Sequence, residues 1–194
     1  INTDGIKEQI HGKGTGVVFN QPPTRVPASE FPVRFDIADY RPGGRAAVDA
    51  GTTYHDMTSS CGARWDPIGP LQPGLYYAPC DVKLNSSALT GAVTIAAEGT
   101  IQVSGSLADF EPFVDGLLFI SDSAADKAIQ VSSSDSTYLG YMFAGRGRLD
   151  LAGSGNTYLC GLLADRVDIT DDRLSIRASD CVRPARTAAA PSLV

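Results

Sequence analysis

Acidic side chains gather near the end of the chain, where two of them are adjacent: Asp165, Asp168, Asp171 and Asp172. Carboxylate oxygens at short spacing are the ligands that Ca²⁺ prefers. The sequence lacks both the Asp-x-Asp-x-Asp-Gly loop and the Gly-Gly-x-Gly-x-Asp repeat that arrange such ligands around calcium. Arginines occur close by in the sequence: Arg146, Arg148, Arg166 and Arg173. We therefore interpret the cluster as a solvated face of alternating charge and predict no metal site.

A second candidate acid lies at the start of the chain, in Asn2-Thr3-Asp4-Gly5. This segment resembles the Asn-Thr-Asp-Gly signature of polygalacturonase-type glycoside hydrolases, which are parallel β-helices. The signature is followed there by two adjacent aspartates, a Gly-His-Gly and an Arg-x-Lys, so that acid and base flank a bound uronate. Here Ile10-His11-Gly12 comes early, Asp171-Asp172 comes near the other end, and no Arg-x-Lys occurs. We interpret the segment as an Asn/Asp turn.

Other catalytic motifs are also missing. The sequence has no Gly-x-Ser-x-Gly and no phosphate-binding Gly-x-x-x-x-Gly-Lys. Its two histidines, His11 and His55, offer few choices of general base, and we interpret His55 as a loop residue. We predict a non-enzymatic protein with no catalytic residues and no cofactor.

The cysteines indicate the compartment. Cys61, Cys80, Cys160 and Cys181 are at least 19 residues apart, whereas zinc ligands come in closely spaced pairs. We therefore favour two disulfides, formed in an oxidising compartment, over free buried thiols. Pairing Cys61 with Cys80 and Cys160 with Cys181 closes the shortest loops, and it is the pairing that we predict. The expected location is extracytoplasmic, either at the cell surface or secreted.

Composition limits the class of protein and its partners. The chain has 194 residues, 43% of them hydrophobic, which is enough to bury the core of one domain. Its net charge of -6 disfavours nucleic acid as a partner. No run approaches the roughly 18 apolar residues of a membrane-spanning helix. Because the chain begins with Ile1 rather than Met, we expect a processed protein or a fragment, with membrane contact only through a segment missing from this chain.

A short unit repeats from Gly74 to Cys181: an apolar-x-apolar triplet, a polar corner, then another triplet. Residues 136–144 are similar to residues 156–164, an offset of 20 residues that also relates Val131 to Leu151. A constant offset without helical periodicity predicts a parallel β-helix with rungs of about 20 residues. The alternative is an antiparallel β-sandwich. It is less favoured because two-residue hairpin signals are rare, Asp115-Gly116 being one exception, and because a sandwich gives no reason for the repeat.

The remaining segments are expected to cover this solenoid. Residues 1–20 are predicted as a further rung or an N-terminal cap, and residues 21–73 as a Pro-rich excursion packed on the rungs, with one short helix at Arg45 to Ala50. Residues 74–181 form the rungs, with a loop bulging at Leu107 to Gly116, and residues 182–194 form a flexible tail. Several aromatic residues are expected in the interior or beneath the excursion, although an outward ladder that binds sugars or proteins is an alternative: Tyr76, Tyr77, Tyr138, Tyr141, Phe143 and Tyr158.

Three segments together carry a likeness to a bacterial family: Phe35–Ala47 with Asp-Ile-Ala-Asp-Tyr, Gly74–Tyr77 with Gly-Leu-Tyr-Tyr, and Leu89–Ile101. They resemble the extracytoplasmic β-helical region of membrane-anchored proteins related to Tad (tight adherence) pilus assembly, over about Val33 to Ile176. The resemblance implies anchoring through an upstream membrane helix and brings no catalytic residues. The expected function is a non-enzymatic structural or adhesive extracellular module of a pilus-like or cell-envelope assembly, with protein partners or self-association. The alternative is a polysaccharide-binding or polysaccharide-degrading β-helix protein, for which the partners are glycans.

Overall fold

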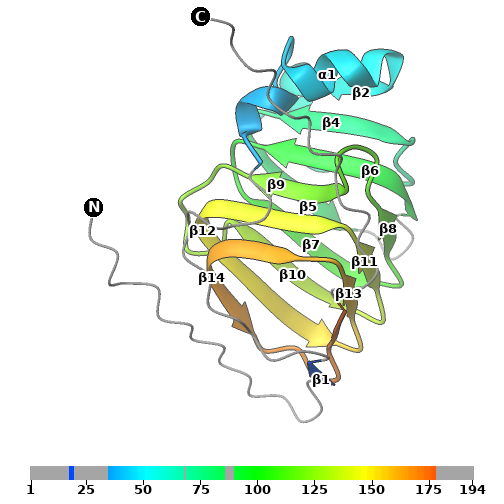
Figure 1. Ribbon diagram of the computed structural model, residues 1–194, viewed down its shortest axis with the longest axis vertical. Coiled ribbons are helices and arrows are strands. Elements are labelled where there is room, and N and C mark those ends of the chain that lie inside the picture. The colour runs from blue at the N-terminus through cyan, green and yellow to red at the C-terminus, as the bar shows by residue number, and fades with distance from the viewer. Residues whose placement is uncertain (1–17, 20–34, 68, 86–89, 178–194) are drawn as a thin grey trace, which may run out of the picture.

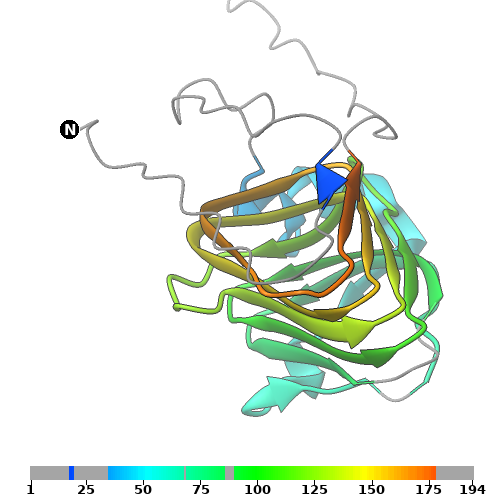
Figure 2. The same ribbon diagram turned by 90° about the horizontal axis from the view of Figure 1, so that it is seen from below.

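The computed structural model describes residues 18–19, 35–67, 69–85 and 90–177. This part of the chain winds into a parallel β-solenoid of about six turns, with equivalent positions about 20 residues apart (Figure 1). Viewed along the stack, the strands of successive turns overlie one another (Figure 2). Every pairing between the described strands is parallel. The predicted parallel β-helix is confirmed, and the antiparallel sandwich is excluded.

The strands stack in three ladders. The first ladder stacks β2 (Tyr54–Asp56), β4 (Gly74–Ala78), β6 (Thr90–Ala97), β9 (Leu117–Ser121), β12 (Tyr141–Ser154) and β14 (Leu162–Ile169). The second stacks β3 (Arg64–Trp65), β5 (Asp81–Asn85), β7 (Ile101–Ser106), β10 (Ile129–Ser134) and the later parts of β12 and β14. The third stacks the start of β6, β8 (Asp109–Glu111), β11 (Thr137–Leu139), β13 (Thr157–Leu159), β15 (Ser175–Arg177) and β1 (Val18–Phe19).

The core lies inside the coils because alternate side chains of each strand point inward. Val131 is paired with Leu151 on one side and with Val103 on the other, and all three side chains are buried. Tyr138 stacks on Tyr158 in the same way, with ring centroids 5.2 Å apart. The repeat offset therefore places like residues directly above one another, which removes their apolar surface from water.

The solenoid begins earlier than the triplet pattern predicted. Strands β2 and β3 pair with β4 and β5, so part of the expected non-repetitive segment 21–73 forms a turn of its own. These two strands are only three and two residues long, too short for a period of two to show in the sequence. The predicted helix at Arg45 to Ala50 is confirmed as α1.

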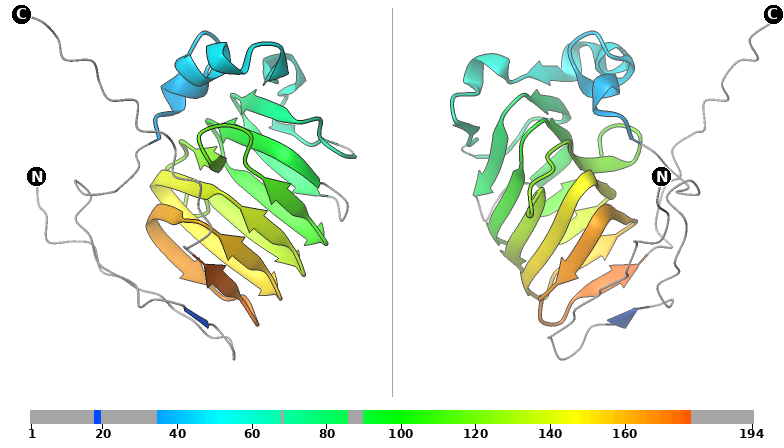
Figure 3. Two further views of the ribbon diagram at one scale, coloured as in Figure 1. Left: turned by 45° about the vertical axis from the view of Figure 1, so that its right-hand side comes forward. Right: turned by 90° about the vertical axis from the view of Figure 1, so that its left-hand side faces the viewer.

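Residues 35–53, which we call the strap, cover the outer face of the first ladder (Figure 3). The strap comprises η2 (Ile37–Tyr40), α1 (Arg45–Ala50) and η3 (Gly51–Thr53); a further short 3-10 helix, η4 (Thr58–Ser60), follows β2. Four strap residues bury their side chains against the outward residues of β4, β6 and β9: Phe35, Ile37, Tyr40 and Ala46. Strands β4 and β9 are therefore buried on both faces, which is why they read as nearly continuous hydrophobic runs.

The predicted loop at Leu107 to Gly116 is only partly correct. Asp109–Glu111 form strand β8 of the third ladder, and the loop is limited to the turn that ends at Gly116. The other extra residues lie between β9 and β10, in residues 122–128, because the pairing of Ile101 with Ile129 spans 28 residues.

Strand β1 extends the third ladder past β15, at the C-terminal end of the stack. Within the predicted segment 1–20 only Val18 and Phe19 are described. The predicted tail, 182–194, lies outside the described residues.

Candidate functional site

The acidic cluster near the end of the chain is divided between the surface and the interior. Asp168 accepts from Arg148 at 2.8 Å and from Arg166 at 2.7 Å on the outer face of the second ladder. Arg148 also pairs with Asp126, at 3.1 Å. In the part of the chain that the structure describes, no three His, Cys, Asp or Glu side chains are arranged to hold a metal ion.

Most of these ion pairs join side chains of adjacent turns. Lys127, in the loop before β10, lies 2.8 Å from Asp150 on β12. Arg146, at the corner of β12, pairs with the carboxylate of Asp122 at 3.0 Å and also donates to its carbonyl oxygen. Charged groups on this face therefore tie one turn of the solenoid to the next.

Asp171 is completely buried, unlike its exposed neighbour Asp172. Its Oδ2 accepts a hydrogen bond from Asn156 Nδ2, whereas its Oδ1 has no partner. Burial raises the pKa of this carboxyl, because the anion loses its hydration. The adjacent Asp171-Asp172 pair therefore does not present two carboxylates to one solvent-exposed site.

Asn156 connects Asp171 to the polar corner of the neighbouring turn. Its amide donates to the carbonyl of Ser133, and its Oδ1 accepts from Ser133 Oγ at 3.1 Å and from the backbone N–H of Ser136 at 3.2 Å. Ser133 Oγ also lies 2.7 Å from the hydroxyl of Tyr138. Tyr158, stacked beneath Tyr138, has a buried hydroxyl without a partner. The side chains of Asn156, Ser133 and Tyr138 therefore have hydrogen-bond partners at this buried corner, whereas Tyr158 Oη and Asp171 Oδ1 have none.

Of the two histidines, the structure describes only His55. His55 lies in β2 rather than in the predicted loop, and its ring stacks on Tyr76 with centroids 4.4 Å apart. The loop prediction was wrong because β2 gains its structure from pairing with β4, not from its own sequence. His11 and the segment Asn2-Thr3-Asp4-Gly5 lie outside the described residues.

One predicted disulfide is confirmed. Cys61 and Cys80 are bonded, with Cα atoms 5.8 Å apart, and they link the end of η4 to the start of β5. Cys160 is buried at the corner between β13 and β14. Its predicted partner, Cys181, lies outside the described residues, so this second bond stays a prediction.

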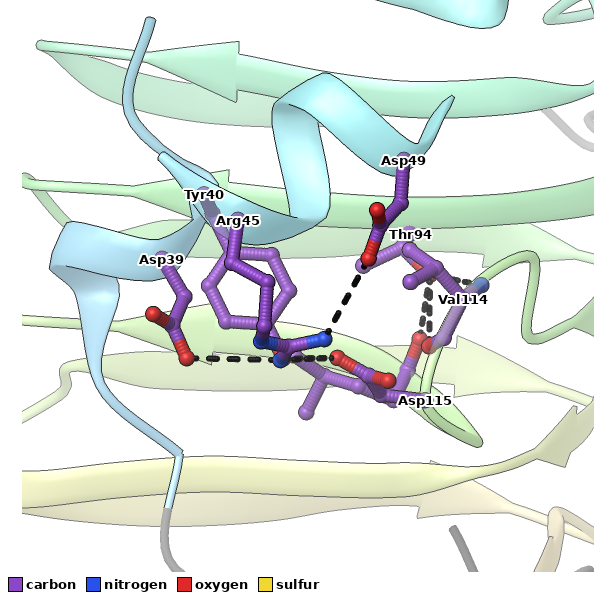
Figure 4. A network of polar contacts seen from close by, with 8 residues as sticks. Asp39, Tyr40, Arg45, Asp49, Thr94, Val114 and Asp115 are labelled. Atoms are coloured by element: carbon purple, nitrogen blue, oxygen red, sulfur yellow. Dashed lines mark hydrogen bonds and ion pairs between the residues drawn. The ribbon is translucent and has the colours of Figure 1, made fainter. Parts of the chain in front are cut away.

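The strap is held to the solenoid by a polar cluster, which we call the clasp (Figure 4). Tyr40 Oη donates to Asp115 Oδ2 at 3.1 Å, and Arg45 Nη2 donates to the same oxygen at 2.9 Å. Arg45 also contacts Asp39 at 3.3 Å. Burial, followed by the nearby Asp115 carboxylate, raises the pKa of Tyr40 far above its ordinary value. Tyr40 therefore stays a neutral donor.

The clasp depends on a tight turn at Asp115-Gly116. Both residues have positive φ angles, 55° and 66°, which the Asp-Gly dipeptide accommodates readily. Thr94, on β6, braces the turn: its hydroxyl accepts from the backbone N–H groups of Phe113 and Val114 and donates to the carbonyl of Leu117 at 2.6 Å. The hairpin signal in the sequence thus forms a projecting turn that presents Asp115 to the strap.

An open groove of about 390 Å³ lies beside the strap. It is bounded by the start of the strap on one side and by the ends of β9 and the corner of β12 on the other. Its lining is Phe35, Asp36, Ile37, Asp39, Ile120, Ser121, Asp122, Phe143, Gly145 and Arg146. The groove combines apolar and aromatic walls with a mainly acidic rim, and it is our candidate functional site.

The aromatic residues singled out in the sequence fall into two sets. Tyr76, Tyr138 and Tyr158 are in the interior cluster. Tyr77, Tyr141 and Phe143 belong to the outer cluster beneath the strap. The expectation that they fill the interior or lie under the excursion is confirmed for Tyr76, Tyr77, Tyr138 and Tyr158. Tyr141 and Phe143 face outward and are only partly buried, and Phe143 lines the groove.

The sequence pattern gave no indication of the groove. Its residues come from three separate segments, and no spacing along the chain brings them together, although Phe35 to Asp39 lie in the segment that carries the family likeness and Phe143 was among the aromatic residues singled out. Asp115-Gly116 marks a turn but does not reveal that Tyr40 and Arg45 bind it.

Comparison with protein-family models, with curated proteins and with solved structures found no match to this chain. No helix among the described residues is both long and apolar enough to cross a membrane. Function is therefore inferred from the geometry of the chain itself.

Proposed function

We propose that this chain is a non-enzymatic structural or adhesive module that works outside the cytoplasm, in a pilus-like or cell-envelope assembly. The observation that supports this most is how the charged side chains are used. Lys127 with Asp150, Arg146 with Asp122, and Arg148 with Asp168 each join adjacent turns. Carboxylates engaged in this way stabilise a scaffold and leave fewer free groups for acid and base chemistry.

Two further features fit a scaffold. In-register stacking makes a solenoid stiff, with long faces suited to docking partners. The Cys61–Cys80 disulfide braces the first turns and is the kind of bond that persists in an oxidising compartment. The likeness of 35–47, 74–77 and 89–101 to Tad-related proteins points to the same type of assembly.

The test is a deletion of the gene in its source organism, complemented with the wild-type chain. We expect the deletion to reduce surface adherence, and the complementing protein to be labelled by a membrane-impermeant biotin reagent with Cys61 and Cys80 oxidised. A protein that is found reduced in the cytoplasm, or a deletion without effect on adherence, would contradict the proposal. Purified chain incubated with acidic polysaccharides should release no reducing ends.

A polysaccharide-binding or polysaccharide-degrading protein is the second candidate. It is favoured by a row of outward side chains at equivalent positions on the flat second ladder: Lys83, Gln102, Gln130, Asp150 and Asp168. If this row binds glycans, the wild-type chain should bind on a glycan array and the variant Gln130→Ala should not. Hydrolysis of an acidic polysaccharide that disappears in Asp4→Asn would favour an enzyme instead.

A further inference from the structure

The groove beside the strap has apolar walls. Phe35 contacts Phe143 edge to face, with ring centroids 5.7 Å apart, and the buried Ile37 and Ile120 complete the walls. The Phe143 ring lies over Gly145, where an added Cβ would come within 2.7 Å of the ring. The walls of the groove are therefore apolar and largely aromatic.

The rim of the groove is acidic. Three aspartates line it, Asp36, Asp39 and Asp122, against one arginine, Arg146. Arg146 is already engaged by the carboxylate and the carbonyl of Asp122. Asp39 is paired with Arg45 at 3.3 Å.

Asp36 is the carboxylate with most capacity left. Its Oδ1 accepts from the backbone N–H of Ala38 at 2.9 Å, which caps η2. No ion pair to Asp36 is formed within the described part of the chain, and the residue is exposed. A negative charge therefore faces solvent beside two phenylalanine rings.

We propose that this groove binds a lysine or arginine side chain of a protein partner. Such a side chain has an apolar stem and a cationic end, so the stem packs on Phe35 and Phe143 while the cation meets Asp36. Aromatic faces add cation–π attraction. A uronate or a phosphate would instead meet three carboxylates and a single arginine that is already paired. The volume of about 390 Å³ is within the range of sites for small ligands, roughly 300 to 1,000 Å³.

This inference deepens the proposed function, because it gives the chemistry of a protein partner, but its test measures the groove alone. The ¹⁵N-labelled chain is titrated with three acetylated, amidated peptides: Ala-Lys-Ala-Lys-Ala, the same peptide with norleucine for lysine, and the same with glutamate. The lysine peptide should shift the amide signals of Ile37, Gly145 and Arg146, and the other two peptides should not. Raising the salt concentration should weaken the binding.

Two variants test the residues involved. Asp36→Asn removes the charge but keeps an oxygen that caps η2, and it should weaken binding of the lysine peptide by about threefold or more. The matched control is Asp49→Asn, which removes an exposed charge from α1, outside the groove, and should leave binding unchanged. Phe143→Leu keeps an apolar wall and should weaken binding through loss of the aromatic face.

Several outcomes would overturn the inference. Equal binding of the norleucine peptide would show a purely apolar groove, and equal effects of Asp36→Asn and Asp49→Asn would show binding through overall charge only. Shifts at Ile37 and Gly145 produced by an oligosaccharide, but not by the lysine peptide, would assign the groove to a glycan. Failure of the wild-type chain to bind the lysine peptide would refute this site and leave the proposed function standing, because adherence is measured separately in the deletion strain.

Discussion

The hydroxyl of Tyr40 donates a hydrogen bond to the carboxylate of Asp115 across 75 residues of sequence, at 3.1 Å. This bond joins the strap to the tight turn at Asp115-Gly116, which precedes β9. Arg45 donates to the same carboxylate oxygen. The Asp115 side chain on the solenoid therefore binds two side chains of the strap. The position of the candidate groove depends on this contact, because the start of the strap forms one of its walls.

Replacing Tyr40 with phenylalanine should loosen the strap while keeping its apolar packing. The lost hydrogen bond is worth about 1 kcal/mol of unfolding free energy, and Asp115 remains paired with Arg45. Urea denaturation measures the change. The double variant Tyr40→Phe, Asp115→Ala should lose less than the sum of the two single changes, because both remove the same contact. Strict additivity would contradict the clasp.

Tyr158 and Tyr138 provide a matched pair for the interior. The hydroxyl of Tyr158 is buried without a partner, so Tyr158→Phe should raise the unfolding free energy, by about 1 kcal/mol. Tyr138 lies directly above it in the stack, but its hydroxyl bonds to Ser133, so Tyr138→Phe should lower the unfolding free energy by a similar amount. Thermal unfolding of the two variants measures both effects. Changes in unfolding free energy of the same sign would contradict this assignment of hydrogen bonds to Tyr138 and Tyr158.

Asp171 should make the protein less stable as the pH rises. Burial raises the pKa of Asp171 in the folded state above its ordinary value of 3.8, so the folded state holds this proton more tightly than the unfolded state. The contribution is fully present below pH 3.8 and is lost as the pH passes through the raised pKa. The hydrogen bond from Asn156 and the charge of Arg173 lower the pKa of Asp171, and the carboxylate of Asp172 raises it, but burial is the largest effect. Asp171 in turn raises the pKa of Tyr138 and Tyr158.

The variant Asp171→Asn isolates that contribution from those of the other carboxylates. The difference in unfolding free energy between variant and wild type should increase in favour of the variant from pH 4 to pH 7. Asp49→Asn, which removes an exposed carboxylate from α1, serves as the control. Parallel pH profiles for wild type and Asp171→Asn would disprove a buried, proton-binding Asp171.

The Cys61–Cys80 disulfide should contribute about 3 kcal/mol, the value expected for a loop of this length. The variant Cys61→Ser, Cys80→Ser should lose this amount in urea denaturation and should be cleaved first within residues 54–67 by limited proteolysis. Unchanged stability would show that the bond does not constrain the unfolded chain.

The same variant tests the second predicted disulfide. If Cys160 is bonded to Cys181, a reducing agent should destabilise Cys61→Ser, Cys80→Ser further, and peptide mapping without reduction should recover a linked pair from the two segments. Absence of a linked peptide, together with insensitivity to reduction, would contradict the pairing.

The repeat was predictable because it is written locally. Tyr138 and Tyr158 occupy the same place in two similar segments, and so do Val131 and Leu151. Each pair becomes a contact once the coils stack in parallel. The first turn was not predictable in this way, since β2 and β3 are short and acquire strand structure by pairing with β4 and β5.

The sequence alone favoured the parallel β-helix, its rung length and the Cys61–Cys80 pairing. Stacking the turns in register satisfies a constant offset between buried residues, and this pairing of cysteines closes a short loop. Tertiary structure alone decided where the strap lies, that Tyr40 and Arg45 meet Asp115, and that Asp36 and Phe143 share a groove. These contacts join segments that do not repeat, so their partners depend on the shape of the finished solenoid and not on any spacing along the chain.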